Sequence, residues 1–139
     1  MVAGHICLDI TPVFRTDNYL DIQQVFTPGH LTNMMGVKIA AGGVVPNVGI
    51  SLSIMGLNCQ LIGKIGKDFF GEDILNFLKQ LNVSESIVRT TSENTSYTVV
   101  IAPPGVDRIF FQDSGANNKF TYDDINFEIV KKARLFLFG

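Results

Sequence analysis

Short apolar runs recur along the chain and predict the strands of a sheet. Residues 2–10 and 59–63 are mostly apolar and too short for a buried helix. Residues 135–139 (LFLFG) are apolar throughout, which is the pattern of a strand covered on both faces in a parallel sheet. We therefore expect a strand in each of the three segments.

Two segments have the pattern of helices. In residues 71–82 apolar side chains recur every three or four positions, which places them on one helix face. Residues 46–55 are apolar on nearly all sides, which predicts a helix buried inside a domain. Pro46 suits the first turn of that helix, and Gly56 suits its C-terminal cap. The expected buried face of the helix over 71–82 consists of Ile74, Leu75, Leu78 and Leu81.

A third helix is predicted near the C-terminal end. Thr121 and Asp124 have the spacing of a capping box, which marks a helix start. We expect this helix to reach Ala133. Its expected buried positions are Ile125, Ile129, Val130 and Ala133.

A hairpin and a polar segment interrupt the strand–helix alternation. The runs TSYTVVI and DRIFFQD flank the turn sequence APPG and predict a β-hairpin. Residues 11–38 are polar, rich in turn residues and poorly periodic. We interpret segments at about 11–38 and 95–113 as a flap beside the main sheet. The remaining alternation predicts one α/β domain over 1–139 with a mostly parallel sheet.

Composition and charge exclude some partners. The 139 residues are 46% hydrophobic and carry 11 basic and 13 acidic side chains. This balance gives no basic surface for nucleic acid. No apolar run has the length of a membrane span, and the N-terminus has no basic secretory signal. We therefore expect neither a nucleic-acid partner nor a membrane.

Cysteine and histidine positions indicate no cross-link and no metal. Cys7 and Cys59 each lie alone in an apolar run, so no disulfide framework is predicted and a reduced, cytoplasmic setting is expected. His5 and His30 have no cysteine, histidine or acidic partners at the spacing of metal ligands. No metal site is predicted in this chain.

Common nucleotide-binding motifs are absent. The P-loop needs Ser or Thr after its Gly-Lys pair, but Ile65 follows Lys64, and Asn58 occupies the place of the first glycine. The glycines at 63, 66 and 71 do not have the G-x-G-x-x-G spacing either. No Ser, Cys or Thr lies in a nucleophile elbow.

Candidate binding residues gather around a glycine pair. Gly42 and Gly43 precede the helix predicted over 46–55, and glycine lets a ligand approach the backbone where a helix presents unpaired N–H groups. Asp9 ends the first predicted strand, and Asn47 offers a donor and an acceptor. This combination suits a polyhydroxylated ligand such as a sugar. A tight strand-to-helix turn beside a solvated strand-end acid explains the same residues without a ligand.

A second glycine-rich segment, GKIGKDFFG, contains Asp68 three residues before the start of the helix predicted over 71–82. We expect Asp68 to cap this helix rather than to bind a ligand, because a side-chain oxygen at that position accepts orphan N–H groups.

Four motifs together resemble the ribokinase-like (PfkB) carbohydrate kinase family. They are GHxxxD near the N-terminus, GGVVPN, GKIGKDFFG and TSYTVVIAPPGVDRIFFQDSGAN, and they occur in family order over essentially the whole chain. The resemblance implies an α/β sandwich with a small β lid over a sugar site, the lid being formed by the segments at about 11–38 and 95–113. It implies that Asp9 and Asn47 hold sugar hydroxyls, and that Gly42 and Gly43 bring the backbone against the sugar.

Several positions depart from the family pattern. Cys7 stands where ribokinase and some other members have Asn, two residues before the strand-end Asp. Val44 and Val45 replace smaller residues, and Gly49 stands where Ala, Ser or Thr is common. Because of these departures, the sequence does not identify which sugar binds, and a nucleoside is also among the expected ligands.

The family's catalytic Asp in a G-x-G-D loop, its magnesium-linked N-x-x-E motif and its ATP-binding segments are absent and would lie beyond Gly139. The resemblance therefore implies the truncated, substrate-binding N-terminal part of an ATP-dependent sugar kinase. ATP and Mg²⁺ would bind outside this chain, which would hold no catalytic residue and be inactive as a kinase alone.

Two other interpretations remain. The chain is alternatively a non-catalytic module that binds a sugar or nucleoside or forms a homodimer through its lid. A homodimer is plausible because Ile109, Phe110 and Phe111 give both faces of the hairpin apolar side chains. A generic α/β domain with a structural glycine turn is the third interpretation.

Overall fold

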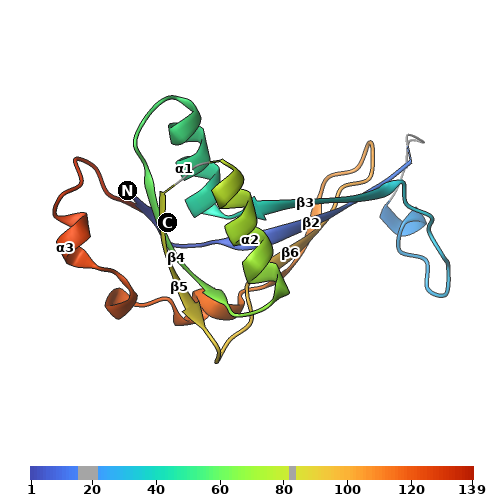
Figure 1. Ribbon diagram of the computed structural model, residues 1–139. Helices are drawn as coiled ribbons and strands as arrows, with labels where there is room; N and C mark the ends of the chain where they lie inside the picture. The colour runs from blue at the N-terminus through green and yellow to red at the C-terminus, as the bar shows by residue number, and fades with distance from the viewer. Residues whose placement is uncertain (16–21, 82–83) are drawn as a thin grey trace.

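The computed structural model describes residues 1–15, 22–81 and 84–139. In these residues the strands form two four-stranded sheets (Figure 1). The first sheet has only parallel neighbours, in the order β5 (Ser84–Thr90), β4 (Gln60–Gly66), β1 (Val2–Ala3), β8 (Leu137–Phe138). The second is mixed, in the order β3 (Gly36–Gly42), β2 (Cys7–Val13), β6 (Tyr97–Ile101), β7 (Ile109–Asp113).

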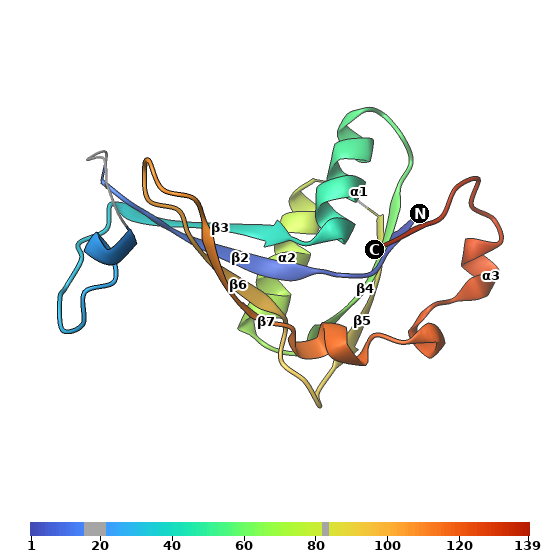
Figure 2. The ribbon, with the colours of Figure 1, turned by 180° about the vertical axis from the view of Figure 1, so that it is seen from behind.

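The second sheet projects from the body of the molecule as an arm, as both Figure 1 and Figure 2 show. Its strands β6 and β7 are antiparallel, which confirms the predicted hairpin. The segment interpreted as a polar flap contributes regular strands to it, because Thr11 to Val13 pair with Gly36 to Lys38. A short 3₁₀ turn, η1 (Ile22–Gln24), lies near the tip of the arm.

The strand predicted over residues 2–10 is in fact two strands, one in each sheet. The chain breaks at Gly4, whose φ of +129° is a conformation that favours glycine. The side chain of Asn117 then pairs with the backbone of Ile6: the Ile6 N–H donates to Asn117 Oδ1 (3.1 Å), and Asn117 Nδ2 donates to the Ile6 carbonyl (2.9 Å). The prediction of one strand was wrong because an amide side chain distant in sequence replaces the strand partner.

His5, the residue after the break at Gly4, also has both of its backbone groups hydrogen-bonded. The His5 N–H donates to the carbonyl of Gly139 (2.8 Å), and the His5 carbonyl accepts from the N–H of Val45 (3.1 Å). The chain therefore changes sheets without leaving these buried backbone groups unpaired.

Helix α2 (Phe69–Gln80) contacts strands of both sheets and begins two residues before the predicted start at Gly71. Asp68 is its N-cap and accepts a hydrogen bond from the N–H of Gly71 (2.9 Å). Leu81 is 47% exposed, contrary to prediction, because the helix ends before it. The other three expected core positions of this helix, Ile74, Leu75 and Leu78, are buried.

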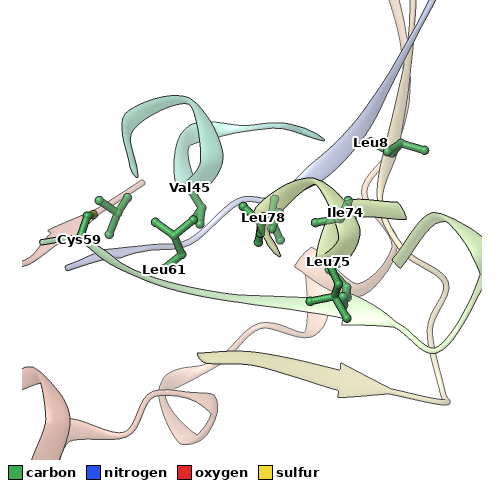
Figure 3. Packing of buried hydrophobic residues seen from close by; sticks show 10 residues of the cluster. Leu8, Val45, Cys59, Leu61, Ile74, Leu75 and Leu78 are labelled. Carbon is green, nitrogen blue, oxygen red and sulfur yellow. The ribbon is translucent and has the colours of Figure 1, made fainter. Parts of the chain in front are cut away.

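The core lies between the two long helices and the sheets (Figure 3). Side chains from β1, β4, the start of β2 and both helices converge there. The buried cluster consists of Val2, Ile6, Leu8, Val45, Cys59, Leu61, Ile65, Ile74, Leu75 and Leu78.

Helix α1 (Val44–Ile54) is less buried than its apolar pattern predicted. Val45, Pro46 and Gly49 face the core, but Ile54 is 78% exposed, and no residue that the structure describes covers that side. At Gly49 the backbone of α1 comes close to the side chain of Leu61, because a Cβ there would lie 2.0 Å from Cδ2 of Leu61.

The end of α1 is as predicted. Gly56 has a φ of +83°, and its N–H donates to the carbonyl of Ser53 (3.0 Å). The N–H of Leu57 donates to the carbonyl of Leu52 (3.0 Å). These two bonds form a Schellman motif, which depends on glycine.

The long C-terminal helix was a wrong prediction. The N–H of Thr121 does donate to Asp124 Oδ2 (2.8 Å), but this cap begins only the 3₁₀ turn η3 (Tyr122–Asp124). Asn126 then caps a separate short helix, α3 (Phe127–Val130). The expected core positions Ile125, Ile129, Val130 and Ala133 are half-buried rather than buried.

Strands β8 and β5 compare differently with expectation. β8 pairs with β1 in a parallel sheet, which confirms the prediction, and among the described residues it is an edge strand with Phe138 64% exposed. β5, which no sequence pattern predicted, pairs with β4 along its whole length. Its composition, SESIVRT, is too polar to be recognised as a buried strand.

The Asn117 contact can be tested by stability. We expect Asn117→Leu to lower the free energy of unfolding by about 2–5 kcal/mol, because it leaves both backbone groups of Ile6 without their partner. Urea denaturation measures this loss. The exposed neighbour Asn118 is the matched control, and Asn118→Leu is expected to change stability by about 0.5 kcal/mol or less. Equal losses in the two variants would contradict the assigned role.

Candidate functional site

The predicted site residues Asp9 and Gly42 are in contact. Strands β2 and β3 pair so that Asp9 lies opposite Ala40, and Gly42 ends β3 two residues later. A Cβ on Gly42 would lie 2.2 to 2.6 Å from the carboxyl atoms of Asp9. Only glycine therefore leaves room for the carboxylate in this position.

Gly43 makes a second close approach, to His5. Its φ of +89° is a conformation that L side chains rarely adopt, and it is the N-cap of α1. A Cβ there would lie 2.6 Å from the carbonyl oxygen and 2.7 Å from Nδ1 of His5. The sequence excluded His5 as a metal ligand and placed it in the GHxxxD motif, but it gave no sign that His5 packs against the glycine pair.

Asn47 lies one helical turn after Gly43, near the start of α1. Its backbone N–H donates to the carbonyl of Gly43 (3.2 Å), and its carbonyl accepts from Oγ of Ser51 (2.6 Å). In the described part of the chain its side-chain amide has no hydrogen-bond partner, and the residue is exposed. The amide is therefore available to a ligand.

A row of polar side chains crosses the second sheet at Asp9. Asp9 pairs with Thr98 on β6, and Thr98 pairs with Gln112 on β7. Directly paired residues have their side chains on the same face of a sheet, so these three side chains share one face. Gln112 Nε2 also lies 2.9 Å from Nε2 of His5. We call Asp9, Thr98 and Gln112 the polar row.

A hollow of about 250 Å³ lies elsewhere, and none of the predicted site residues lines it. Tyr97 and Asp113 belong to it, and both are one position away from the polar row, so they point to the opposite face of the sheet. Its full lining is Asp68, Phe69, Phe70, Asn94, Thr95, Tyr97 and Asp113. The candidate binding residues instead lie on the face that carries Asp9.

Asp68, at the edge of this hollow, has a structural role. Its carboxylate accepts from the N–H and the Oγ1–H of Thr95 (2.7 Å each) as well as from Gly71. Burial alone would raise the pKa of Asp68, but the hydrogen bonds from Thr95 and Gly71 outweigh it and lower the pKa overall. The expectation of a cap is confirmed.

Neither a metal cluster nor a membrane span is found in the part of the chain that the structure describes. There, no group of three or more His, Cys, Asp and Glu side chains is placed to hold an ion. None of the described helices combines the length and apolarity needed to cross a bilayer.

The family follows from comparison with known proteins. The model of the pfkB family of carbohydrate kinases matches residues 4–139. The chain belongs to this family. A sugar kinase of Pyrococcus horikoshii is 32% identical over 99 residues, which are 70% of this chain and 32% of the relative. Its crystal structure in complex with ATP matches 99% of this pfkB chain and 42% of that one, with a TM-score of 0.77 and 27% identity.

Two further relatives agree with the assignment. Fructokinase-1 of Zea mays is 29% identical over 103 residues, which are 72% of this chain and 32% of the relative. Ribokinase of Giardia lamblia, at 19% identity, has a TM-score of 0.82 over 99% of this chain and 43% of that one, and shows the fold. The ribokinase-like fold is confirmed. The pfkB chain spans about a third of the length of the curated relatives it matches.

Cys7, which departs from the family pattern, lies inside the candidate site of this pfkB chain. The Cys7 thiol donates to Asp9 Oδ1 (Sγ–Oδ1 3.4 Å) and accepts from Oγ1 of Thr98 (3.8 Å). Burial, followed by the charge of Asp9, raises the pKa of Cys7 to about 12. The thiol is therefore protonated at neutral pH and is a poor nucleophile.

The contact between Gly42 and Asp9 can be tested by a double substitution. We expect Gly42→Ala to destabilise the chain by about 1–3 kcal/mol, because the new methyl group must displace the carboxylate. In an Asp9→Ala background the same substitution is expected to cost far less, since the obstructing carboxyl group is gone. Urea unfolding of the four proteins gives the coupling. Purely additive losses would show that Asp9 does not oppose the methyl group.

Proposed function

We propose that this chain is the substrate-binding part of an ATP-dependent sugar kinase, a transferase that moves the γ-phosphoryl group of ATP onto a sugar hydroxyl. The main support is the contact of the Asp9 carboxylate with Gly42. The next residue, Gly43, lies one helical turn before Asn47, whose side-chain amide is free. An ionised carboxylate accepts from hydroxyl groups, and an amide both donates to them and accepts from them. Family membership supports the same class of substrate.

The glycine pair would act by bringing the backbone to the sugar. Asp9 and His5 already occupy the space where side chains on Gly42 and Gly43 would stand. A ligand beside this pair therefore meets backbone and polar groups instead of β-carbons. Gln112 of the polar row, which is exposed, would face the same ligand from the second sheet, which we propose to be a lid.

ATP and Mg²⁺ are expected cofactors of the whole enzyme, held by residues outside this chain. The ATP complex of the Pyrococcus relative supports the nucleotide. For the ion, the described residues offer no group of three or more His, Cys, Asp and Glu side chains placed to hold it. We therefore propose that these 139 residues alone do not catalyse phosphoryl transfer, since positioning of the phosphates supplies most of that catalysis.

A homodimer through the lid is the second element of the proposal. A row of paired apolar residues crosses the second sheet on the face opposite the polar row; it consists of Ile39, Ile10, Val99 and Phe111. Ile39 and Phe111 are about half exposed. An exposed apolar row of this kind suits burial against a second copy. The same row supports the alternative of a non-catalytic module that binds a sugar or nucleoside and dimerises.

Sedimentation velocity tests the dimer. We expect a dimer for the wild-type protein and a monomer for Ile39→Lys, because a buried charge in the row opposes association. Met55→Lys, at the exposed C-cap residue of α1, is the control and is expected to remain dimeric. A monomeric wild type would contradict the proposal.

A cytoplasmic location is also inferred. It is supported by the free thiols of Cys7 and Cys59, which persist in a reducing compartment.

The sugar site is tested by phosphoryl transfer in the full-length protein that contains this chain, with fructose, ribose and nucleosides as acceptors. We expect Asp9→Asn and Asn47→Ala each to lower kcat/KM about 10- to 100-fold, because each removes a hydrogen bond to a hydroxyl. Asp107→Asn, at an exposed lid carboxylate, is the matched control and is expected to have little effect. Unchanged kcat/KM in both site variants would contradict the assigned site.

A further inference from the structure

A short series of hydrogen-bonded side chains connects the lid to Asp9. Thr98 is 8% exposed and Cys7 is 2% exposed, so both lie below the surface that Asp9 reaches. Thr98 Oγ1 donates to Cys7 Sγ (3.8 Å), and Cys7 Sγ donates to Asp9 Oδ1 (3.4 Å). The three residues sit on β2 and β6 with Thr98 directly opposite Asp9.

The chemistry of the thiol decides which group donates in each of these two hydrogen bonds. A thiol has one proton, and its sulfur is a weak acceptor. When the sulfur accepts from Thr98, its single proton is left for Asp9. The S–H group remains present at neutral pH because burial and the charge of Asp9 raise the pKa of Cys7 to about 12. One oxygen of Asp9 therefore always has a donor from inside the protein.

Asp9 also lies close to Gly42, the residue that pairs with Cys7 across the two strands. The backbone of Gly42 lies so close that a Cβ there would be 2.2 Å from Asp9 Oδ2. The carboxylate is thus next to both the thiol and the glycine. Because S–H is a weaker donor than N–H or O–H, it orients the carboxylate while leaving most of its accepting capacity to a ligand.

We propose that Cys7 is a positioning residue for the sugar-binding carboxylate of Asp9, and that Thr98 acts on Asp9 through Cys7. The proposal rests on the proposed role of Asp9 in sugar binding. It explains why a cysteine serves at this position: it is small enough to be buried beside Gly42, and it carries one directed proton.

The hydrogen bond itself can be measured in the 139-residue chain without any sugar. In Cys59→Ala the thiol of Cys7 is the only one left, so the S–H stretching band in the infrared or Raman spectrum reports Cys7 alone. We expect the band at a lower frequency than that of a solvated thiol, because S–H donates to a carboxylate. Adding Asp9→Ala is expected to raise the frequency, and adding Thr98→Val to shift it. A band that Asp9→Ala leaves unchanged would overturn the proposal.

The effect on the ligand is measured in the full-length protein, with fructose and ribose as probes. We expect Cys7→Ala to raise KM for the substrate sugar about 3- to 10-fold, because substrate binding loses an oriented carboxylate. The kcat of this variant is expected to stay within about twofold of the wild-type value. Cys7→Ser, which retains a directed proton, is expected to restore KM to within about twofold of wild type. Cys59→Ala removes another buried cysteine and is the matched control: it is expected to lower Tm without changing KM.

The role of Thr98 is tested by a double-mutant cycle. Thr98→Val is expected to raise KM in the wild-type background but to have no further effect in Cys7→Ala, because its influence passes through the thiol. Additive effects would show that Thr98 acts independently of Cys7.

The two proposals fail in different ways. If Asp9→Asn abolishes sugar phosphorylation while Cys7→Ala leaves KM unchanged, the positioning role is wrong and the proposed function stands. If Asp9→Asn has no effect on KM or kcat, the proposed sugar site is wrong, whatever the S–H band shows.

Discussion

The pairing of the Asn117 side chain with the backbone of Ile6 is the contact on which the rest of the structure depends. It satisfies the N–H and the carbonyl of a residue that has left one sheet and not yet joined the next. Such groups are costly to bury unpaired. With them paired, one apolar run supplies the central strand of the parallel sheet and then continues into the arm. Asp9 lies on that continuation, so its position follows from the break.

The glycines around this break show how closely the elements approach. Gly42 and Gly43 leave space for Asp9 and for His5, and Gly49 leaves space for Leu61 of β4. The third contact sets how near α1 lies to the parallel sheet, whereas the first two bring polar groups against the backbone. Close packing of α1 on the side chain of Leu61 explains Gly49. At Gly42 and Gly43 the polar side chains of Asp9 and His5 occupy the place of a β-carbon, and we propose that a ligand binds beside them.

Local patterns were sufficient for several elements. The periodicity of residues 71–82, the cap at Asp68, the Schellman end at Gly56 and the hairpin are all properties of neighbouring residues, and each was predicted. The glycine pair and Asp9 were singled out from residue type alone. The structure adds that two of these residues touch, which residue type does not show.

The remaining features depend on contacts between distant residues. The break in the first strand requires Asn117, which lies 111 positions away from Ile6. The polar row exists only because β2, β6 and β7 adopt one register, and shifting β6 by one residue would turn Thr98 to the opposite face. The exposed sides of α1 and β8 could not be predicted either, because an apolar pattern does not state whether a neighbour covers it.

The most direct test of a sugar site at Asp9 is a crystal structure of the full-length protein with a bound sugar, fructose or ribose. The account predicts sugar hydroxyls within hydrogen-bond distance of the Asp9 carboxylate and the Asn47 amide, with the ring against Gly42 and Gly43. A sugar bound instead in the hollow beside Phe69 and Tyr97, with Asp9 contacting none of it, would contradict the account.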